Sequence, residues 1–260
     1  MPELPEVETV VRTIAPHIVG RTIVAAHFGS RFVTPGDREA LASAVTGRAI
    51  TKVSRRGKFI WIALDEGSLS IHLGMTGKLL FNAISGPHTH GHFELDTGML
   101  LYEDARQFGR IEWGSERIAP LGPEPLEIGK EEFVTLLRSK PTKVKPLLLN
   151  QSFLAGLGNI YVDEALFRAG IHPLTKASTI SRPRARVLHA AIVELLQSAI
   201  AMKGSSISDY VDADGKRGGF QEMHQVYGKE GEPCTRCGKP IRRIVVAQRG
   251  THYCAACQKR

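Results

Sequence analysis

The spacing of apolar and polar residues predicts a helix near the start of the chain. Apolar residues recur on one helical face: Val7, Val10, Val11, Ile14 and Ile18. Pro5 suits a first helical turn, and the carboxylates of Glu6 and Glu8 complement the positive end of a helix. Gly20 ends the predicted helix, and Pro16 bends its last turn.

Between residues 22 and 113 the apolar spacing shifts toward two, which is typical of strands. Short apolar stretches are separated there by Gly, Asp or Pro, among them TIVAAHF, KFIWIAL, SLSIHLG, KLLFNA and MLLYEDA. A short helix is predicted around residues 38–45. The pattern therefore predicts a β-rich domain, a sandwich with the opening helix packed alongside.

Residues 114–129 hold three prolines and three glycines and mark a linker. Helical spacing then predicts four helices, over residues 131–138, 143–150, 161–169 and 183–202. The segment 203–225, KGSSISDYVDADGKRGGFQEMHQ, shows no clear periodicity. Loops of this length are uncommon in compact domains and tend to be lids or binding loops, although a plain surface loop fits the residues equally well.

The four cysteines predict a metal site. Cys234 and Cys237 form one C-x-x-C pair and Cys254 and Cys257 another, with sixteen residues between the pairs. Four thiolates make a closed tetrahedral site for one structural zinc ion, and such spacing does not favour disulfides. The apolar run IVVA between the pairs predicts a β-hairpin, and so a zinc ribbon.

Composition narrows the class of partner. Lys and Arg total 34 against 26 Asp and Glu in 260 residues, for a net charge of +8. Such an excess favours polyanions, nucleic acid first and anionic membranes second. No apolar run approaches the length of a membrane span, and the acidic start does not match a signal peptide. We therefore expect a soluble, cytoplasmic protein.

Two kinds of short motif stay ambiguous on the residues alone. The Gly-rich turn 156–158, which leads into Asn159, is either an anion site at a helix start or a helical corner with a capping Asn. Met75 and Phe108 stand beside Gly in IHLGMTGK and RQFG. They are either core residues or wedges that need a partner to bury them.

These segments occur together, in the same order, in one known family. The chain resembles bacterial formamidopyrimidine-DNA glycosylase from residue 1 to residue 260, in MPELPEVE, RRGK, HLGMTG, RQFG, GLGNIYVDEALFRAGIHP, DADGKRGGFQ and the two CxxC pairs. That family shares a superfamily with endonuclease VIII. The resemblance implies an α+β fold of two domains with DNA in the cleft between them. A β-sandwich with flanking helices would span 1–120. A helix-two-turn-helix domain with a lesion lid at 203–225 would span 121–225, followed by a β-hairpin zinc ribbon over 226–260.

The resemblance also assigns the chemistry. In the family the initiator Met is removed and the proline nitrogen, here Pro2, is the nucleophile. The chain would be a bifunctional DNA glycosylase and AP lyase that removes 8-oxoguanine and formamidopyrimidines through an iminium intermediate and β,δ-elimination. A free α-amine has a pKa of about 8, against about 10.4 for Lys, so more of it is unprotonated at neutral pH. Glu3 matches the general acid/base, and Glu6 a supporting carboxylate.

Further residues match the family's contacts to DNA. Three match the residues that fill the void left by the flipped base: Met75, Arg106 and Phe108. Four match the residues that clamp phosphates around the lesion: Lys58, His72, Asn159 and Arg249. Lys58 is also grouped with the catalytic residues, Lys145 has no assigned role, and Gln107 stands where the family has a second arginine. The lid residues nearest the base would be Ser205, Ser206 and Tyr210.

Other functions remain open from the residues. An endonuclease VIII-like glycosylase for oxidised pyrimidines keeps the fold, but the start PELPEVE and the long loop favour oxidised purines. A non-catalytic, zinc-dependent protein that binds damaged DNA has no need of Pro2 and Glu3, and a basic RNA-binding ribbon leaves the N-terminus unexplained. We expect a monomer that acts on damaged double-stranded DNA, without a membrane partner, in the bacterial cytoplasm and at the nucleoid when bound to DNA.

Overall fold

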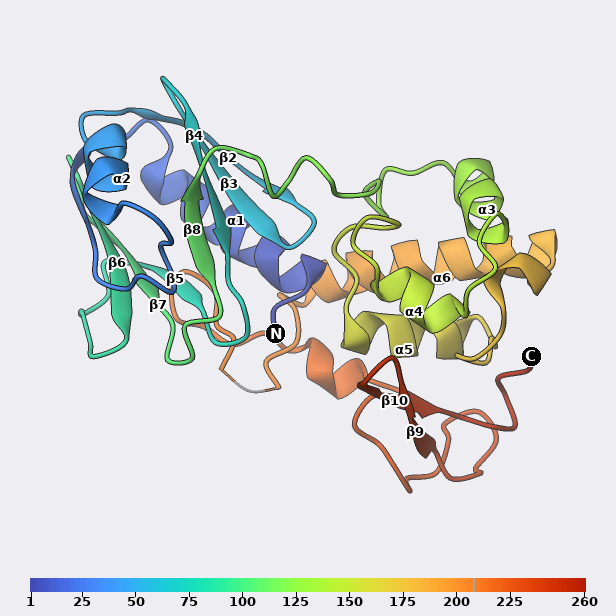
Figure 1. Cartoon of the computed structure of the whole chain (residues 1–260). Coiled ribbons are helices and arrows are strands. Elements are labelled where there is room, and N and C mark those ends of the chain that lie inside the picture. Colours follow the sequence, from blue (N-terminus) through green and yellow to red (C-terminus); the bar gives the residue numbers. More distant parts are fainter. Residues whose placement is uncertain (208) are drawn as a thin grey trace. The chain divides into compact units, whose positions relative to one another are not determined.

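The chain forms two compact units in its computed structural model, which describes residues 1–207 and 209–260 (Figure 1). The first unit consists of Met1–Pro120 with Ile200–Gln221, and the second of Leu121–Ala199 with Glu222–Arg260. Most of the segment expected to be a lid thus packs with the first unit, whereas the sequence had grouped it with the helical domain. No helix within the described ranges is long and apolar enough to cross a membrane.

The predicted opening helix is confirmed as α1 (Leu4–Ile18). Its apolar face is buried, with exposed fractions of 7% or less, at Val7, Val10, Val11, Ile14 and Ile18. Burial of each such side chain stabilises the fold by about 1.5–3 kcal/mol. Glu3 is the N-cap residue and forms a capping box with Glu6, and Pro16 lies inside the last turn. Glu6, which the sequence placed at the start of the helix, is therefore part of its N-terminal cap.

Two four-stranded antiparallel sheets form the sandwich of the first unit. One has the spatial order β1 (Ile23–Phe28), β6 (Thr89–Leu95), β7 (Met99–Glu103) and β5 (Lys78–Phe81). The other has the order β2 (Ile50–Arg56), β3 (Phe59–Leu64), β4 (Ser68–His72) and β8 (Arg110–Trp113). Helix α1 contacts strands of both sheets, and α2 (Arg38–Val45) packs on β1. The β-rich prediction is confirmed, and one apolar core joins α1 to the sheets.

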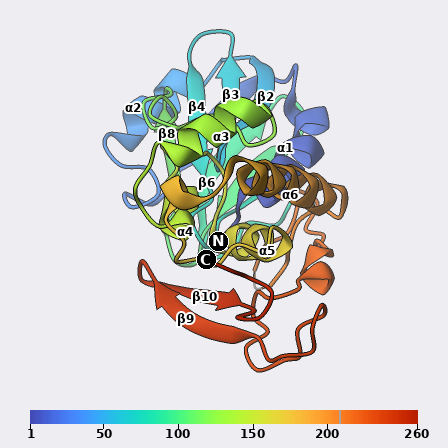
Figure 2. The same cartoon turned by 90° about the vertical axis from the view of Figure 1, so that its right-hand side faces the viewer.

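The second unit is helical and ends in a β-hairpin. Four helices lie within two residues of the predicted bounds: α3 (Lys130–Arg138), α4 (Val144–Leu149), α5 (Asn159–Arg168) and α6 (Arg182–Ala201), whose last two residues belong to the first unit. Two short 3-10 helices were not predicted: η1 (Ala177–Thr179) and η2 (Phe220–Met223), which spans the boundary between the units. The predicted hairpin is confirmed as β9 (Arg242–Val246) and β10 (Arg249–Tyr253). Figure 2 shows this hairpin beside α5, which contacts β10.

Candidate active site and DNA interface

Two of the three predicted catalytic residues, Pro2 and Glu3, lie at the N-terminus of α1. Pro2 is buried, and the exposed fractions of Glu3 and Glu6 are only 2% and 1%. The backbone N–H of Glu3 donates to Glu6 Oε2 at 2.8 Å, which fixes the two carboxyl groups relative to each other. Met1, which precedes this cluster, is 46% exposed.

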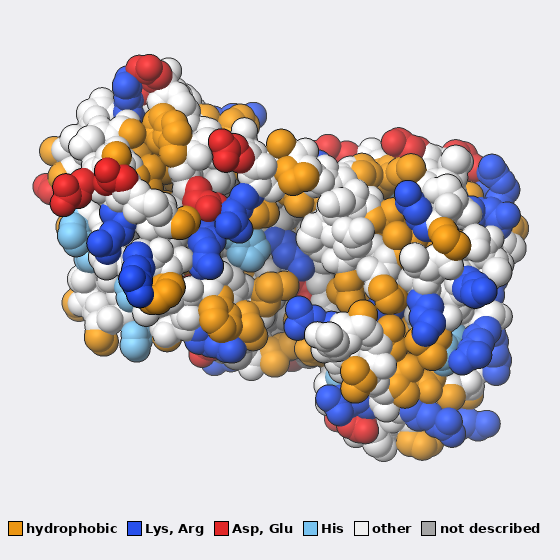
Figure 3. All heavy atoms as spheres, in the orientation of Figure 1, with side chains coloured by type: hydrophobic (Ala, Val, Ile, Leu, Met, Phe, Trp, Pro, Cys, Tyr) orange, Lys and Arg blue, Asp and Glu red, His pale blue; other side chains and the backbone are white. Residues whose placement is uncertain are grey.

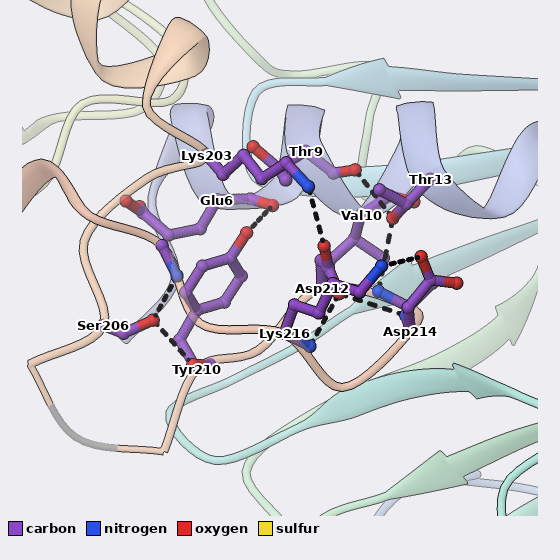
Figure 4. Close-up of polar contacts among 12 residues, drawn as sticks. Glu6, Thr9, Val10, Thr13, Lys203, Ser206, Tyr210, Asp212, Asp214 and Lys216 are labelled. Atoms are coloured by element: carbon purple, nitrogen blue, oxygen red, sulfur yellow. Dashed lines mark hydrogen bonds and ion pairs between the residues drawn. The ribbon is translucent and has the colours of Figure 1, made fainter.

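Glu6 also holds the loop that follows α6. The backbone N–H of Ser205 donates to Glu6 Oε1 at 2.7 Å. The phenol of Tyr210 donates to the backbone carbonyl of Glu6 at 3.3 Å (Figure 4). Burial, and then the charge of Glu6, raise the pKa of Tyr210 above its usual value, so its hydroxyl stays a donor. The predicted catalytic helix and the predicted lid therefore meet at one carboxylate.

The lid is folded around Ser206 and Tyr210. The hydroxyl of Ser206 donates to the Tyr210 carbonyl at 2.8 Å and accepts from the Gly218 N–H at 2.9 Å. Tyr210 belongs to the apolar core of the first unit, as does Ala213. The three predicted lid residues are thus buried in this structure and shape the loop from within. Of the predicted lid, Ser208 lies outside the described residues.

The far end of the lid has its own attachment. Asp212 is 1% exposed, and its Oδ1 accepts from the backbone N–H groups of Asp214 at 3.1 Å and Lys216 at 2.8 Å. Its other oxygen lies 3.6 Å from Lys203 Nζ. The N–H of Ala213 donates to Thr13 Oγ1 of α1 at 3.2 Å (Figure 4). Both ends of the loop are therefore tied to α1.

Lys58 and His72 lie together at the end of the β3–β4 pair, where Phe59 is opposite His72. Burial, then the charges of Lys58, Arg117 and Arg110, lower the pKa of His72 to about 4. Its Nδ1 accepts from the Gly74 N–H at 3.0 Å. The imidazole is therefore neutral at pH 7 with its proton on Nε2, the form that donates one hydrogen bond to a phosphate oxygen.

The predicted void-filling residues are exposed. Met75 is 39% and Phe108 is 52% exposed, so neither is a core residue of its unit. The guanidinium carbon of Arg106 lies 4.7 Å from the centroid of the Phe108 ring. An apolar ring stacked under a cation is suited to contact both bases and phosphates.

The loops that carry these side chains are fixed by Asp104, which the sequence did not single out. Asp104 is fully buried, and its Oδ1 accepts from Thr76 Oγ1 at 2.5 Å and from the Arg106 N–H at 3.2 Å. Its Oδ2 accepts from the Gly109 N–H at 2.8 Å. A Cβ atom on Gly74 would lie 2.5 Å from the Gly109 nitrogen, so the two loops touch. The sequence signal for this role is an Asp at the start of a turn, because an Asp side chain there commonly accepts from the N–H two residues later, as Asp104 does from Arg106.

In the second unit, Asn159 is linked to the hairpin rather than to its own helix. The N-cap of α5 is Gly158, so Asn159 does not cap the helix, and its Nδ2 donates to the Gly250 carbonyl at 2.9 Å. Arg249, the residue before Gly250, is exposed at the start of β10. The preceding turn is tight, since Ala247 and Gln248 have φ values of 49° and 60°. The structure therefore brings the two predicted phosphate contacts of this unit together.

Lys145, which had no assigned role, has a structural role at the contact between α5 and the hairpin. It is fully buried, with Nζ 2.6 Å from Asp163 Oδ1 and 3.3 Å from the Gly250 carbonyl. The other oxygen of Asp163 accepts from the His252 N–H at 2.8 Å. One ion pair thus attaches the hairpin to helices α4 and α5. A second buried acid of α5, Glu164, accepts from the N–H groups of residues 225–227, which lead into the ribbon.

The four predicted zinc ligands converge. Their sulfur atoms all lie within 4.8 Å of one another, with 3.9 Å between Cys234 and Cys257 and 3.5 Å between Cys237 and Cys254. A tetrahedral zinc with Zn–S bonds of about 2.3 Å requires sulfur separations of about 3.8 Å, so the donor set fits one zinc ion. No disulfide links them. The site is closed, and the zinc is structural.

The surface of the second unit is basic around this ribbon. In Figure 3, Lys and Arg side chains gather over the part of the unit where the hairpin lies, with few acidic side chains among them. Arg236 has a structural role instead: it lies over the Phe167 ring and donates to the carbonyls of Phe167 and Arg168 at the end of α5. The remaining basic side chains suit a phosphate backbone.

A β-sandwich with a buried Pro–Glu start, followed by a helical unit and a four-cysteine ribbon, defines a DNA glycosylase of the helix-two-turn-helix type. Three family models match in the same order: the formamidopyrimidine-DNA glycosylase N-terminal domain over residues 1–111, the formamidopyrimidine-DNA glycosylase H2TH domain over 121–211, and the zinc finger found in FPG and IleRS over 231–260. The chain belongs to the formamidopyrimidine-DNA glycosylase family.

Individual relatives agree over the full length. A formamidopyrimidine-DNA glycosylase of Solibacter usitatus is 54% identical, with 100% of both chains covered. Among solved structures, the wild-type Lactococcus lactis Fpg in complex with N7-benzyl-Fapy-dG DNA is 39% identical, with a TM-score of 0.91 and 100% of both chains covered. The Fpg of Thermus thermophilus is 41% identical with a TM-score of 0.90, over 99% of this chain and 98% of that one.

Proposed function

We propose that this enzyme excises oxidised purines, 8-oxoguanine and formamidopyrimidines, from double-stranded DNA and then cleaves the strand, with Pro2 as the nucleophile. The observation that carries the proposal is the buried Pro2–Glu3–Glu6 cluster at the start of α1, in a chain of this family. Removal of Met1 would convert the Pro2 nitrogen from an amide into a secondary amine. Only then can that nitrogen attack.

The proposed reaction begins when the unprotonated amine attacks C1′ of the damaged nucleotide. Glu3 protonates the ring oxygen as the sugar opens, the N–H proton of the attacking amine passes to the departing base, and the bond from C1′ to the base breaks. A secondary amine can then form only a cationic iminium. This cation accepts electron density, so the 3′ and then the 5′ phosphate are eliminated. Glu6 supports the step by holding the backbone of Glu3 at 2.8 Å.

DNA contacts are proposed for both units. Lys58 and His72 in the first unit, with Asn159 and Arg249 in the second, would bind phosphates around the lesion. Exposed side chains of the first unit, Met75, Arg106 and Phe108, would fill the void after base flipping. Of the lid, Ser205, Ser206 and Tyr210 would position the backbone that reads the proton added to the purine by oxidation. We place the functional domains at 1–120, 121–225 and 226–260, and the monomeric enzyme in the bacterial cytoplasm.

Borohydride trapping on a duplex with 8-oxoguanine opposite cytosine tests the proposal. We expect a covalent adduct that maps to an N-terminal Pro2. A Pro2→Gly variant should still bind DNA but trap poorly, and a Glu3→Gln variant should lose base excision. Normal turnover by either variant would refute the assignment.

A lesion panel separates the alternative substrate. Trapping on oxidised-pyrimidine duplexes but not on 8-oxoguanine would indicate an endonuclease VIII-like preference. The two ties of the lid to α1, at Glu6 and Thr13, favour the purine reading because they hold a formed lid over the N-terminal cluster.

A further inference from the structure

A second exposed Arg–Phe pair lies in the turn that follows β1. The Arg31 guanidinium carbon is 5.0 Å from the centroid of the Phe32 ring, and Phe32 is 56% exposed. The pair repeats the features of Arg106 and Phe108, whose separation is 4.7 Å and whose ring is 52% exposed. Neither Arg31 nor Phe32 belongs to the proposed catalytic cluster, the proposed phosphate contacts or the lid.

The two pairs are joined by hydrogen bonds. The hydroxyl of Ser30 donates to Gln107 Oε1 at 2.5 Å, and the N–H of Ile111 donates to the Val33 carbonyl at 2.8 Å. Gln107 stands between Arg106 and Phe108, and its backbone has a φ of 54°. The turn over residues 30–33 is therefore fixed both to the loop that carries Arg106 and Phe108 and to strand β8.

Ser30 also builds the turn itself. It is 7% exposed, and its oxygen accepts from the N–H groups of Phe32 at 3.2 Å and Val33 at 3.3 Å. One hydroxyl thus organises the turn and connects it to Gln107. The connection to Gln107 thus depends on one largely buried hydroxyl.

We propose that the turn over residues 30–33 is an additional contact to duplex DNA, positioned by Gln107 through Ser30. Arg31 binds a backbone phosphate on the flank of the flipped site, and Phe32 packs against the adjoining deoxyribose. The inference rests on the proposed role of Arg106 and Phe108 in the same duplex. Cation-stacked aromatics on a basic protein suit nucleic acid, since the ring packs on sugars or bases while the guanidinium neutralises phosphate.

The first experiment measures binding to a duplex that carries a non-cleavable tetrahydrofuran abasic analogue opposite cytosine, across a salt titration. Arg31→Gln should weaken binding about tenfold and reduce the slope of log K against log salt by about one. Phe32→Ala should weaken binding at least about fivefold, with the slope unchanged. Arg21→Gln, at the other end of β1, and Ile84→Ala, at a side chain 92% exposed, are the matched controls and should bind as the unmodified enzyme does.

The second experiment tests the connection. Ser30→Ala and Gln107→Ala should each reproduce part of the Arg31→Gln loss, and Gln107→Ala combined with Arg31→Gln should be no weaker than Arg31→Gln alone. Ser30→Thr, which keeps the hydroxyl, should restore binding. Fully additive losses would overturn the positioning role of Gln107.

The outcomes separate this inference from the proposed function. If the unmodified enzyme cleaves 8-oxoguanine duplexes while Arg31→Gln and Phe32→Ala bind with unchanged affinity and slope, the additional contact is refuted and the function stands. If the unmodified enzyme neither binds nor cleaves those duplexes, the proposed function fails, and the additional contact fails with it.

Discussion

Single residues of the first unit have their protonation states set by burial. The Tyr210 phenol and the His72 imidazole are both held neutral, the first by a raised pKa and the second by a pKa lowered to about 4. A neutral His72 gives the site beside Lys58 an N–H hydrogen-bond donor without placing a second positive charge in a buried position. We therefore expect a phosphate bound here to interact with the positive charge of Lys58 and to accept one hydrogen bond from His72.

The lowered pKa of His72 predicts a pH-dependent stability. The unfolded chain binds a proton at this residue near pH 6.5 and the folded chain near pH 4, so folding loses stability as pH falls between these values. Replacement by His72→Asn removes the titration and keeps an acceptor for the Gly74 N–H. Urea unfolding at pH 7 and pH 4.5 should show a smaller loss in the variant than in the unmodified enzyme. Equal losses in the two proteins would contradict the assignment.

Asp104 predicts a second effect at this scale. Asp104→Asn keeps the shape but turns an NH₂ group toward a backbone donor, the N–H of Arg106 or of Gly109. The loss of that hydrogen bond costs about 1–3 kcal/mol. We expect lower unfolding free energy and slower excision of 8-oxoguanine. Asp65→Asn, an exposed turn carboxylate that accepts from the Glu66 N–H at 2.9 Å, is the control and should change neither.

The sequence identifies a functional residue when its contacts are close along the chain or when it belongs to a known motif. The cysteine pairs encode their own site, because two C-x-x-C turns leave little freedom in where the thiolates point. Asp104 and Gln107 depend on Thr76 and Ser30, which are 28 and 77 positions away. No local sequence pattern specifies contacts between residues so far apart in the chain, so the roles of Asp104 and Gln107 can be recognised only in the folded structure.

Among the elements, the lid is the one whose contacts the sequence did not predict. Apolar spacing located all the longer helices, because each buries a stripe of regular period. The lid has no period, and its attachment to α1 depends on bonds from Glu6 and Thr13 to residues about 200 positions later. Strand β6, THGHFEL, was also not singled out, since its His and Gly residues interrupt the alternation.

The attachment at Thr13 predicts a separation of two activities. Thr13→Val preserves volume but removes the acceptor for the Ala213 N–H, so the lid should open more often. Excision of 8-oxoguanine should fall several-fold, whereas cleavage of a preformed abasic site, which has no base to cover, should persist. Thr46→Val, at the C-cap of α2, is the control, since the Thr46 hydroxyl donates to the Ala42 carbonyl at 2.8 Å. An equal fall in both activities would show that Thr13 acts on the catalytic cluster and not on the lid.

At the scale of the whole molecule, the first unit and the ribbon of the second differ in what stabilises them. The first has a continuous apolar core that joins α1, both sheets, Tyr210 and Ala213. The ribbon has a core of only a few buried residues: Phe167, Val226, Cys234, Ile241 and Cys254. Two of these are metal ligands, so the ribbon depends on zinc for its fold, as small metal-bound modules do.

This difference predicts the effect of zinc removal. Both tryptophans, Trp61 and Trp113, belong to the first unit, so their fluorescence reports on that unit alone. Chelation, or Cys237→Ser, should release about one zinc per chain and displace Arg249 from its position beside Asn159, weakening DNA binding more than tenfold. Tryptophan emission should not change, because the sandwich core includes no metal ligand. A shift of tryptophan emission in step with zinc release would mean that the sandwich needs the ribbon to stay folded. The loss of DNA binding could then not be assigned to the displacement of Arg249.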